Sequence, residues 1–219
     1  MPPSRPSEPP VRRERNAVET RKRLLDAAEA EFAAKGFAGA RLREVAQSAG
    51  VQQALIHHYF TDKGGLYREV LERALEDTTA GTWAILGKVT GLLSLLEAFV
   101  DMLMRFSATH ANLLAILRME AQSADGSSVA IDLLREQTKP VFEAVRATIA
   151  QMQKDGQVRP EVRPEDLMMG ILSMTLYPVQ EGAFLKMVWG LDVAADDQEA
   201  RRRSILALVS GGVLPAGQR

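Results

Sequence analysis

Apolar residues recur along most of the chain at every third or fourth position, the spacing that places them on one face of an α-helix. The first such face carries Leu25 and Phe32, and Gly36 follows as a stop signal. Asn16 precedes Glu19 by three residues, which is the spacing of a helix-capping box. This pattern predicts a first helix that begins at Asn16 and ends at Gly36.

The same spacing predicts further helices, while the alternating pattern typical of β-strands is nearly absent. Stretches rich in glycine, aspartate and proline separate the predicted helices. The expected ranges are 42–49, 52–59, 62–76, 92–107, 111–122, 129–154, 165–189 and 198–209. The fold class is therefore predicted to be all-α.

The predicted helices change in character near residue 80. Before it they are short and belong to a basic segment; after it they are longer and more apolar. The first ten residues contain five prolines, which disfavour helix and are typical of an extended arm. We therefore expect a disordered proline-rich arm over residues 1–16, a small helical unit over 17–79 and a larger helical bundle over 80–219.

Charge is distributed unevenly along the chain. Residues 1–70 hold 12 Lys and Arg against 9 Asp and Glu, whereas the remainder holds 15 against 19. A basic front on an acidic body is compatible with nucleic-acid binding or with an ordinary solvated face. Arg12, Arg13 and Arg15 of the arm either contact DNA or belong to a disordered tail, and the sequence leaves both readings open.

The amino-acid composition indicates the cellular location of the protein. There is no cysteine, which excludes disulfides and thiolate chemistry, and no apolar run approaches the roughly 18 residues that a membrane span needs. The first residues lack the apolar segment of a signal peptide. We expect a cytoplasmic protein that makes no membrane contact.

The segment VQQALIHHYF, residues 51–60, combines aliphatic residues with uncharged hydrogen-bonding groups and has no acidic side chain. The preceding segment provides apolar positions at Leu42 and Val45, and Gly50 can adopt the positive φ of a tight corner. Two short helices joined at Gly50 have the spacing of a helix-turn-helix, in which the second helix presents its outer face.

That outer face carries Gln52, Gln53, His57 and His58. Glutamine can form paired hydrogen bonds with an adenine edge, and histidine and tyrosine can donate to phosphate oxygens. Basic residues flank the segment, and Lys63 lies where the next helix begins and favours an anion. The flanking basic residues are Arg41, Arg43 and Lys63. The segment therefore reads as a DNA-recognition helix.

From about Thr20 to Leu75 the chain resembles the DNA-binding region of the TetR family of bacterial transcriptional regulators. The resemblance rests on AAEAEFAAKGF, LREVAQSAGV, HHYF and DKGGL, in that order. It implies that base edges or the adjoining backbone are contacted by Gln52, Gln53, Ala54 and His57. It implies that phosphates are contacted mainly by His58, Tyr59 and Lys63, with Phe60 in the core.

Several positions depart from the family pattern. Ala40 and Arg41 stand where Thr or Ser is usual, Gln52-Gln53 replaces Ser-Lys or Ser-Arg, and His57 replaces a more common tyrosine. These departures concern the DNA-contacting surface, so the operator sequence cannot be transferred from the family.

The bundle is expected, by the same resemblance, to bind a small ligand and to dimerise. Apolar and aromatic residues spread over its predicted helices are candidates for the pocket, although each is also an ordinary core residue. The pocket candidates are Trp83, Phe99, Met102, Phe106, Leu113, Leu117, Phe142, Met174, Tyr177, Glu181 and Phe184. Pro178 should free the carbonyl of Met174, which either faces the ligand or merely marks a division between two helices. With no cationic cluster in the bundle, we expect an apolar or weakly polar ligand.

The last two long helices carry apolar stripes suited to a twofold dimer, in competition with the core of the protomer itself. The predicted interface residues are Met168, Ile171, Leu172, Ile205, Leu208 and Val209. Dimerisation would place two recognition helices about 34–36 Å apart, one turn of DNA.

The sequence gives little support for metal binding, cofactor binding or catalysis. His57 and His58 point about 100° apart on a helix and are poor joint ligands, so no metal is expected. No Gly-rich phosphate loop follows a strand and no nucleophile–base pair is evident, so neither a cofactor nor catalysis is expected. We predict a homodimeric repressor released from double-stranded operator DNA by a small molecule. The alternatives are an activator of the same fold, or a helical carrier or enzyme with a vestigial DNA-binding head.

Overall fold

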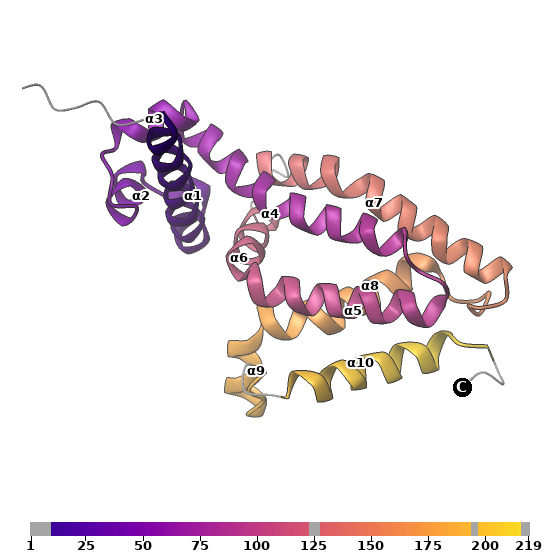
Figure 1. Cartoon of the computed structure of the whole chain (residues 1–219). Coiled ribbons are helices and arrows are strands. Elements are labelled where there is room, and N and C mark those ends of the chain that lie inside the picture. The colour runs from indigo at the N-terminus through magenta and orange to yellow at the C-terminus, as the bar shows by residue number, and fades with distance from the viewer. Residues whose placement is uncertain (1–9, 123–127, 194–196, 216–219) are drawn as a thin grey trace, which may run out of the picture.

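The computed structural model describes residues 10–122, 128–193 and 197–215, and these form helices joined by short turns, without a β-strand (Figure 1). The helices are α1 (Pro10–Gly39), α2 (Leu42–Ser48), α3 (Ala54–Phe60), α4 (Lys63–Leu86), α5 (Leu92–Thr109), α6 (Ala111–Ala121), α7 (Val129–Lys154), α8 (Pro164–Gln180), α9 (Gly182–Trp189) and α10 (Gln198–Val213). The all-α prediction is confirmed.

Helix α1 begins earlier than the sequence predicted. It starts at Pro10, a residue that is tolerated at the first position of a helix because its missing amide has no partner there. Asn16 therefore lies inside α1 and is not its cap, and residues 10–16 are helical instead of part of the arm. Residues 1–9 of the predicted arm lie outside the described residues. Gly36 interrupts α1 with φ 68° and ψ 173°, at the position where the sequence predicted its end.

Helices α1 to α3 and the first half of α4 pack around one core. Its fully buried side chains include Phe32, Ile56 and Leu66, and the Tyr67 ring meets Phe32 edge-on at a centroid distance of 4.7 Å. The same core continues into α6 and α7 through Leu113, Ile116, Ala130 and Leu133. The small helical unit is thus packed onto one end of the bundle.

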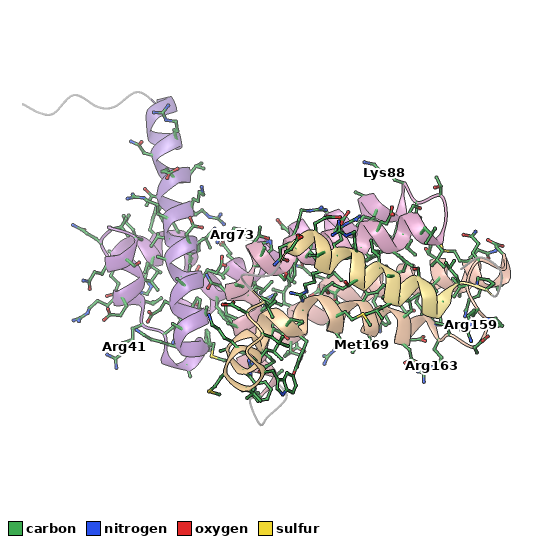
Figure 2. The ribbon with its side chains drawn as sticks, turned by 90° about the horizontal axis from the view of Figure 1, so that it is seen from below. Arg41, Arg73, Lys88, Arg159, Arg163 and Met169 are labelled. Atoms are coloured by element: carbon green, nitrogen blue, oxygen red, sulfur yellow. The ribbon has the colours of Figure 1, made fainter. Side chains whose placement is uncertain are left out.

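Helix α4 runs without interruption through residue 80, where the sequence placed a domain boundary. Its first half belongs to the small unit and its second half lies beside α7 in the bundle (Figure 1). Arg73 donates to Asp26 at 2.6 Å and to Glu29 at 2.7 Å, which ties the middle of α4 to α1. Figure 2 shows Arg73 at this junction. One rigid element therefore joins the two units.

The bundle has a second core formed by α5, α7, α8 and α10. Helix α5 packs against α8 and α10, and α10 lies along the outer side of the pair (Figure 1). Val100 and Ile149 are buried at its centre. Of these helices, α5, α7 and α8 also border the cavity described below.

The long helix predicted over residues 165–189 is divided into α8 and α9 at Glu181. Pro178 removes the amide that would bond to the carbonyl of Met174. Arg201 of α10 donates to that carbonyl at 3.1 Å. The freed carbonyl is therefore satisfied by a neighbouring helix. Pro178 itself lies inside α8, and the division follows at Glu181.

No helix in residues 10–122, 128–193 or 197–215 is both long and apolar enough to cross a bilayer.

Candidate nucleic-acid interface and ligand cavity

The corner between α2 and α3 is a Schellman motif. Gly50 has φ 65°, its amide donates to Gln47 at 3.1 Å, and the Val51 amide donates to Ala46 at 3.0 Å. These two bonds satisfy carbonyls that the end of α2 would otherwise leave open, and the left-handed conformation favours glycine. Val45, Ala46 and Ile56 are buried beneath the corner. The corner thus fixes the direction in which α3 leaves α2.

The predicted recognition surface is exposed. Gln52, Gln53, Ala54, His57 and His58 all face solvent, whereas Ile56 and Phe60 point into the core. Gln52 and Gln53 lie just before the first turn of α3, which begins at Ala54. Hydrogen-bonding side chains therefore project from a short helix whose opposite face is anchored.

The turn after α3 is strained and orders one of these side chains. Thr61 has φ 63° and ψ −61°, and the Asp62 amide donates across it to the Phe60 carbonyl at 2.6 Å, which defines a γ-turn. A residue other than glycine in this region costs about 1–3 kcal/mol. The Thr61 carbonyl lies 3.1 Å from Nδ1 of His57, so the strained turn holds the His57 ring in place.

The first turn of α4 is closely packed against the end of α3. The Asp62 carboxylate accepts from the Gly65 amide at 2.8 Å and caps the helix. A Cβ on residue 65 would lie 2.3 Å from the Phe60 carbonyl oxygen, so only glycine fits. The second glycine of DKGGL therefore has a packing reason.

The flanking basic residues differ in their settings. Arg41 is exposed at the outer edge of the small unit, away from the bundle (Figure 2), and its backbone amide donates to Glu31 at 3.2 Å. Arg43 is exposed beside Glu44. Lys63 is partly buried, with Nζ 3.3 Å from the Ala38 carbonyl and 5.0 Å from the centre of the Phe37 ring. In this conformation Lys63 is turned toward the protein instead of outward.

Tyr59 is likewise only partly exposed, because its ring packs against the core of the small unit and meets His58 edge-on at 5.1 Å. Arg23 of α1, which we did not single out from the sequence, reaches the helix-turn-helix corner. Its guanidinium would lie 3.9 Å from a Cβ placed on Gly50. The signal was present in the basic run Arg21-Lys22-Arg23, whose side chains are all exposed.

A cavity of about 380 Å³ lies inside the bundle between α4, α5, α6, α7 and α8. Five of the predicted pocket residues line it: Phe99, Met102, Phe106, Leu117 and Phe142. Cavities of this size are typical of sites for small organic molecules.

The other predicted pocket residues do not line this cavity. Trp83 is 49% exposed, and Met174, Tyr177 and Phe184 also face solvent. Leu113 is buried in the core of the small unit. Glu181 pairs with Arg118 at 2.9 Å instead of facing a ligand. Apart from Leu113, which is buried on α6, these residues lie near the division between α8 and α9 or on an exposed side of α4.

Helix α6 links the cavity to the small unit. Leu114 and Leu117 line the cavity, while Leu113 and Ile116 belong to the core shared with α1 and α4. At the end of α6 the Tyr67 hydroxyl of α4 donates to Glu120 at 2.8 Å. Burial, followed by this hydrogen bond to a carboxylate, raises the pKa of Tyr67 well above its usual value.

The predicted dimer residues differ in burial and fall into three groups. Ile171, Ile205 and Val209 are buried within the protomer and cannot be presented to a partner. Met168 and Leu172 are partly buried and line the cavity. Leu208 alone among the predicted residues is exposed, at 65%. The apolar stripes therefore belong mainly to the core of the chain itself.

Other residues of α8 and α10 form an outward face that the sequence did not indicate. Met169 is 56% exposed on α8, where Figure 2 shows it at the surface. Ala207 and Gly211 are exposed near Leu208 on α10, and a Cβ added at Gly211 would meet open space. An exposed leucine flanked by small residues on α10 permits close approach of another helix.

Groups of three or more His, Asp or Glu side chains that could hold a metal do not occur within the part of the chain that the structure describes.

Two family models match the chain. Residues 24–70 match the model described as bacterial regulatory proteins, tetR family, and residues 93–209 match the model described as tetracyclin repressor-like, C-terminal domain. The second match alone covers more than half of the chain. The boundary between the two matches falls within or just after α4.

The proteins to which this chain is similar are named as transcriptional repressors or regulators. The HTH-type transcriptional repressor SCO4008 of Streptomyces coelicolor is 26% identical over 165 residues, which cover 75% of this chain and 81% of that protein. The HTH-type transcriptional regulator RutR of Escherichia coli is 27% identical over 164 residues, 75% of this chain and 76% of its own. The structure of the ketosteroid transcriptional regulator KstR2 of Mycobacterium tuberculosis aligns with a TM-score of 0.71 at 21% identity, covering 89% of this chain and 95% of that one.

Proposed function

The chain belongs to the tetR family of bacterial regulatory proteins, and on this premise we propose that it is a cytoplasmic, homodimeric repressor released from its operator by a small molecule. The observation that carries the proposal is the exposed set of Gln52, Gln53 and His57 on a helix anchored by Ile56 and the Gly50 corner. A cavity in the same chain lies against the helix that leads to this surface.

In this function α3 enters the major groove of double-stranded DNA. Gln52 and Gln53 contact base edges, and His57 and Ala54 contact bases or the adjoining backbone. Phosphates are bound by His58, Tyr59, Arg41 and Arg43, and by Lys63 once it turns outward from Ala38. Arg23 adds a cation beside the corner. The phosphate contacts position the helix, and the glutamines supply the sequence preference.

A twofold dimer supplies the second recognition helix that a palindromic operator requires. The exposed face around Met169 of α8 and Leu208 of α10 supports an interface there. The buried side chains of Ile171, Ile205 and Val209 pack behind this face and hold it in place. Substituting Leu208 with a charged residue, as in Leu208→Glu, should therefore leave the protomer folded while separating the dimer.

Release requires that the ligand bind one arrangement of the protein more tightly than another. Helices α4 and α6 each border both the cavity and the core of the small unit, α4 through Thr82 and Tyr67 and α6 through Leu117 and Ile116. A ligand that displaces either helix changes the direction of the small unit relative to the bundle. In a dimer this changes the separation of the two α3 helices, which weakens binding to one DNA duplex.

The assignment of the DNA surface is tested with a gel-shift assay on the DNA upstream of the protein's own gene. The triple substitution Gln52→Ala, Gln53→Ala, His57→Ala should lower specific affinity by at least about 2 kcal/mol, roughly 30-fold, since each lost bidentate base contact costs about 1–3 kcal/mol. The matched control is Gln151→Ala, another exposed glutamine, which lies on α7.

Retained specific binding by the triple variant would refute these contacts. Failure of the unaltered protein to prefer any DNA sequence, combined with tight binding of small molecules, would favour a helical carrier with an idle head.

A further inference from the structure

The cavity in the bundle has an almost entirely apolar lining. Among the described residues around it there is no Lys, Arg, His, Asp or Glu side chain. The polar atoms come from threonine hydroxyls on two neighbouring helices, Thr78, Thr79 and Thr82 of α4 and Thr138 of α7. Helices α5, α6 and α8 contribute aliphatic, methionine and phenylalanine side chains. The cavity thus has one weakly polar wall and is otherwise apolar.

Each of these hydroxyls already donates its hydrogen to its own helix. Thr82 donates to the Thr78 carbonyl at 3.0 Å, and Thr138 donates to the Leu134 carbonyl at 2.7 Å. Thr78 and Thr79 bond in the same way to the carbonyls four residues before them. A hydroxyl has one hydrogen and two lone pairs, so each can still accept a hydrogen bond. The polar wall therefore offers acceptors.

Charged ligands fit this lining poorly. A carboxylate or phosphate inside the cavity would lose its hydration and find no cation, and its only donors would be hydroxyls that must first leave their helix carbonyls. A cation would meet no carboxylate, although the rings of Phe99, Phe106 and Phe142 could attract a quaternary ammonium. A neutral molecule loses less hydration, and its donor finds a ready acceptor at the α4–α7 wall.

We propose that the ligand of this cavity is a neutral molecule with an apolar body and a hydrogen-bond donor, such as a hydroxyl, that faces Thr82 and Thr138. This inference rests on the proposed ligand-released function and specifies its ligand class. The donor contacts α4 directly, which is the helix that continues into the DNA-binding unit. The hydrogen bond that selects the ligand is therefore made to α4, the same helix that must respond to the ligand.

Four probes with the same ten-carbon chain test the class by isothermal titration calorimetry at pH 8. They are decan-1-ol, methyl decyl ether, decanoate and decyltrimethylammonium, each kept below the concentration at which it aggregates. Decan-1-ol should bind about threefold to tenfold more tightly than the ether, the usual range for one hydrogen bond. Decanoate and decyltrimethylammonium should each bind at least about tenfold more weakly than decan-1-ol.

Valine substitution of the threonines locates the contact. The double variant Thr82→Val, Thr138→Val should lose the preference for alcohol over ether while binding the ether as the unaltered protein does. Thr138→Ser retains the hydroxyl and should retain the preference, which keeps the test valid if the double variant folds poorly. The matched control is Thr148→Val, because Thr148 also donates to a carbonyl on α7, at 2.9 Å, but does not line the cavity.

The outcomes separate this inference from the function on which it rests. Tightest binding by decanoate or by decyltrimethylammonium would overturn the ligand class, as would an unchanged alcohol preference in the double variant. If no probe binds while the protein still shifts its operator, the class is wrong and the DNA-binding function stands. If the alcohol binds as expected but the operator complex never forms or never responds, the class stands and release by ligand is wrong.

Discussion

The DNA-binding unit and the bundle differ in where the hydrogen-bonding side chains of their helices lie. In the unit the interior is filled by Phe32, Ile56 and Leu66, and the hydrogen-bonding groups of α3 face outward. In the bundle the interior contains a cavity, and its hydroxyls face inward from α4 and α7. A surface that reads DNA needs rigid support, whereas a site that responds to a ligand needs space. The predictions below test that difference, beginning with the largest effect.

The first prediction compares two phenylalanines. Phe32 is fully buried in the small unit, and Phe32→Ala should lower the free energy of unfolding by about 3–5 kcal/mol. Phe142 borders existing space, so Phe142→Ala removes fewer contacts and should cost only about 1–2 kcal/mol. Urea denaturation of both variants measures the difference. Equal losses would show that the bundle is packed as tightly in solution as the unit.

The second prediction concerns Tyr67, which lies between the two regions. Its pKa is raised by burial and by Glu120, so the folded protein keeps this proton at pH values where the unfolded chain, with a pKa near 10, releases it. Its contribution to stability is therefore complete below about pH 10 and declines as the pH rises, by up to about 1.4 kcal/mol per pH unit.

Tyr67→Phe has no proton to release and should show a shallower alkaline decline. Urea denaturation between pH 9 and pH 11 measures the two slopes, and Tyr177→Phe, at an exposed tyrosine, serves as control. Parallel declines in the unaltered protein and in Tyr67→Phe would contradict the raised pKa.

The third prediction addresses communication between the regions and has the smallest expected effect. The Tyr67–Glu120 hydrogen bond joins α4 to α6 at 2.8 Å. Removing it with Tyr67→Phe should weaken the effect of ligand on operator affinity by about 0.5–1.5 kcal/mol, with little change in affinity when ligand is absent. The measurement is operator affinity with and without saturating decan-1-ol. An unchanged ligand effect would assign the communication to α4 alone.

The small unit was largely predictable from sequence because its constraints are local. A glycine with positive φ, an aspartate cap and apolar residues three or four apart determine α2, α3 and the start of α4 within a few residues. The outward-facing positions of α3 follow from the same periodicity, since a residue opposite Ile56 must face outward. What the sequence did not show was the orientation of Lys63 and the reach of Arg23, which depend on neighbours distant along the chain.

The bundle was predicted in its helices but not in its surfaces. Periodicity identifies an apolar stripe without indicating whether its partner is the same chain, a second copy or empty space. For this reason Ile171, Ile205 and Val209 were assigned to a dimer interface although the protomer buries them. Small residues such as Gly211 give no hydrophobic signal, and the role of threonines at the cavity depends on helices α4 and α7 meeting in space.

The uninterrupted course of α4 also determines how far a small displacement travels. Thr82 follows Lys63 by 19 residues in α4, a separation of about 28 Å along the helix axis at 1.5 Å per residue. A rotation of only about 5° at its inner end swings the outer end by roughly 2.5 Å, close to the full length of a hydrogen bond. Arg73 joins α4 to α1, and α1, α2 and α3 share one core with the first half of α4, so we expect these helices to move with it. Under the proposed function, a tilt too slight to alter the shape of the protein would thus be enough to take a glutamine out of reach of its base.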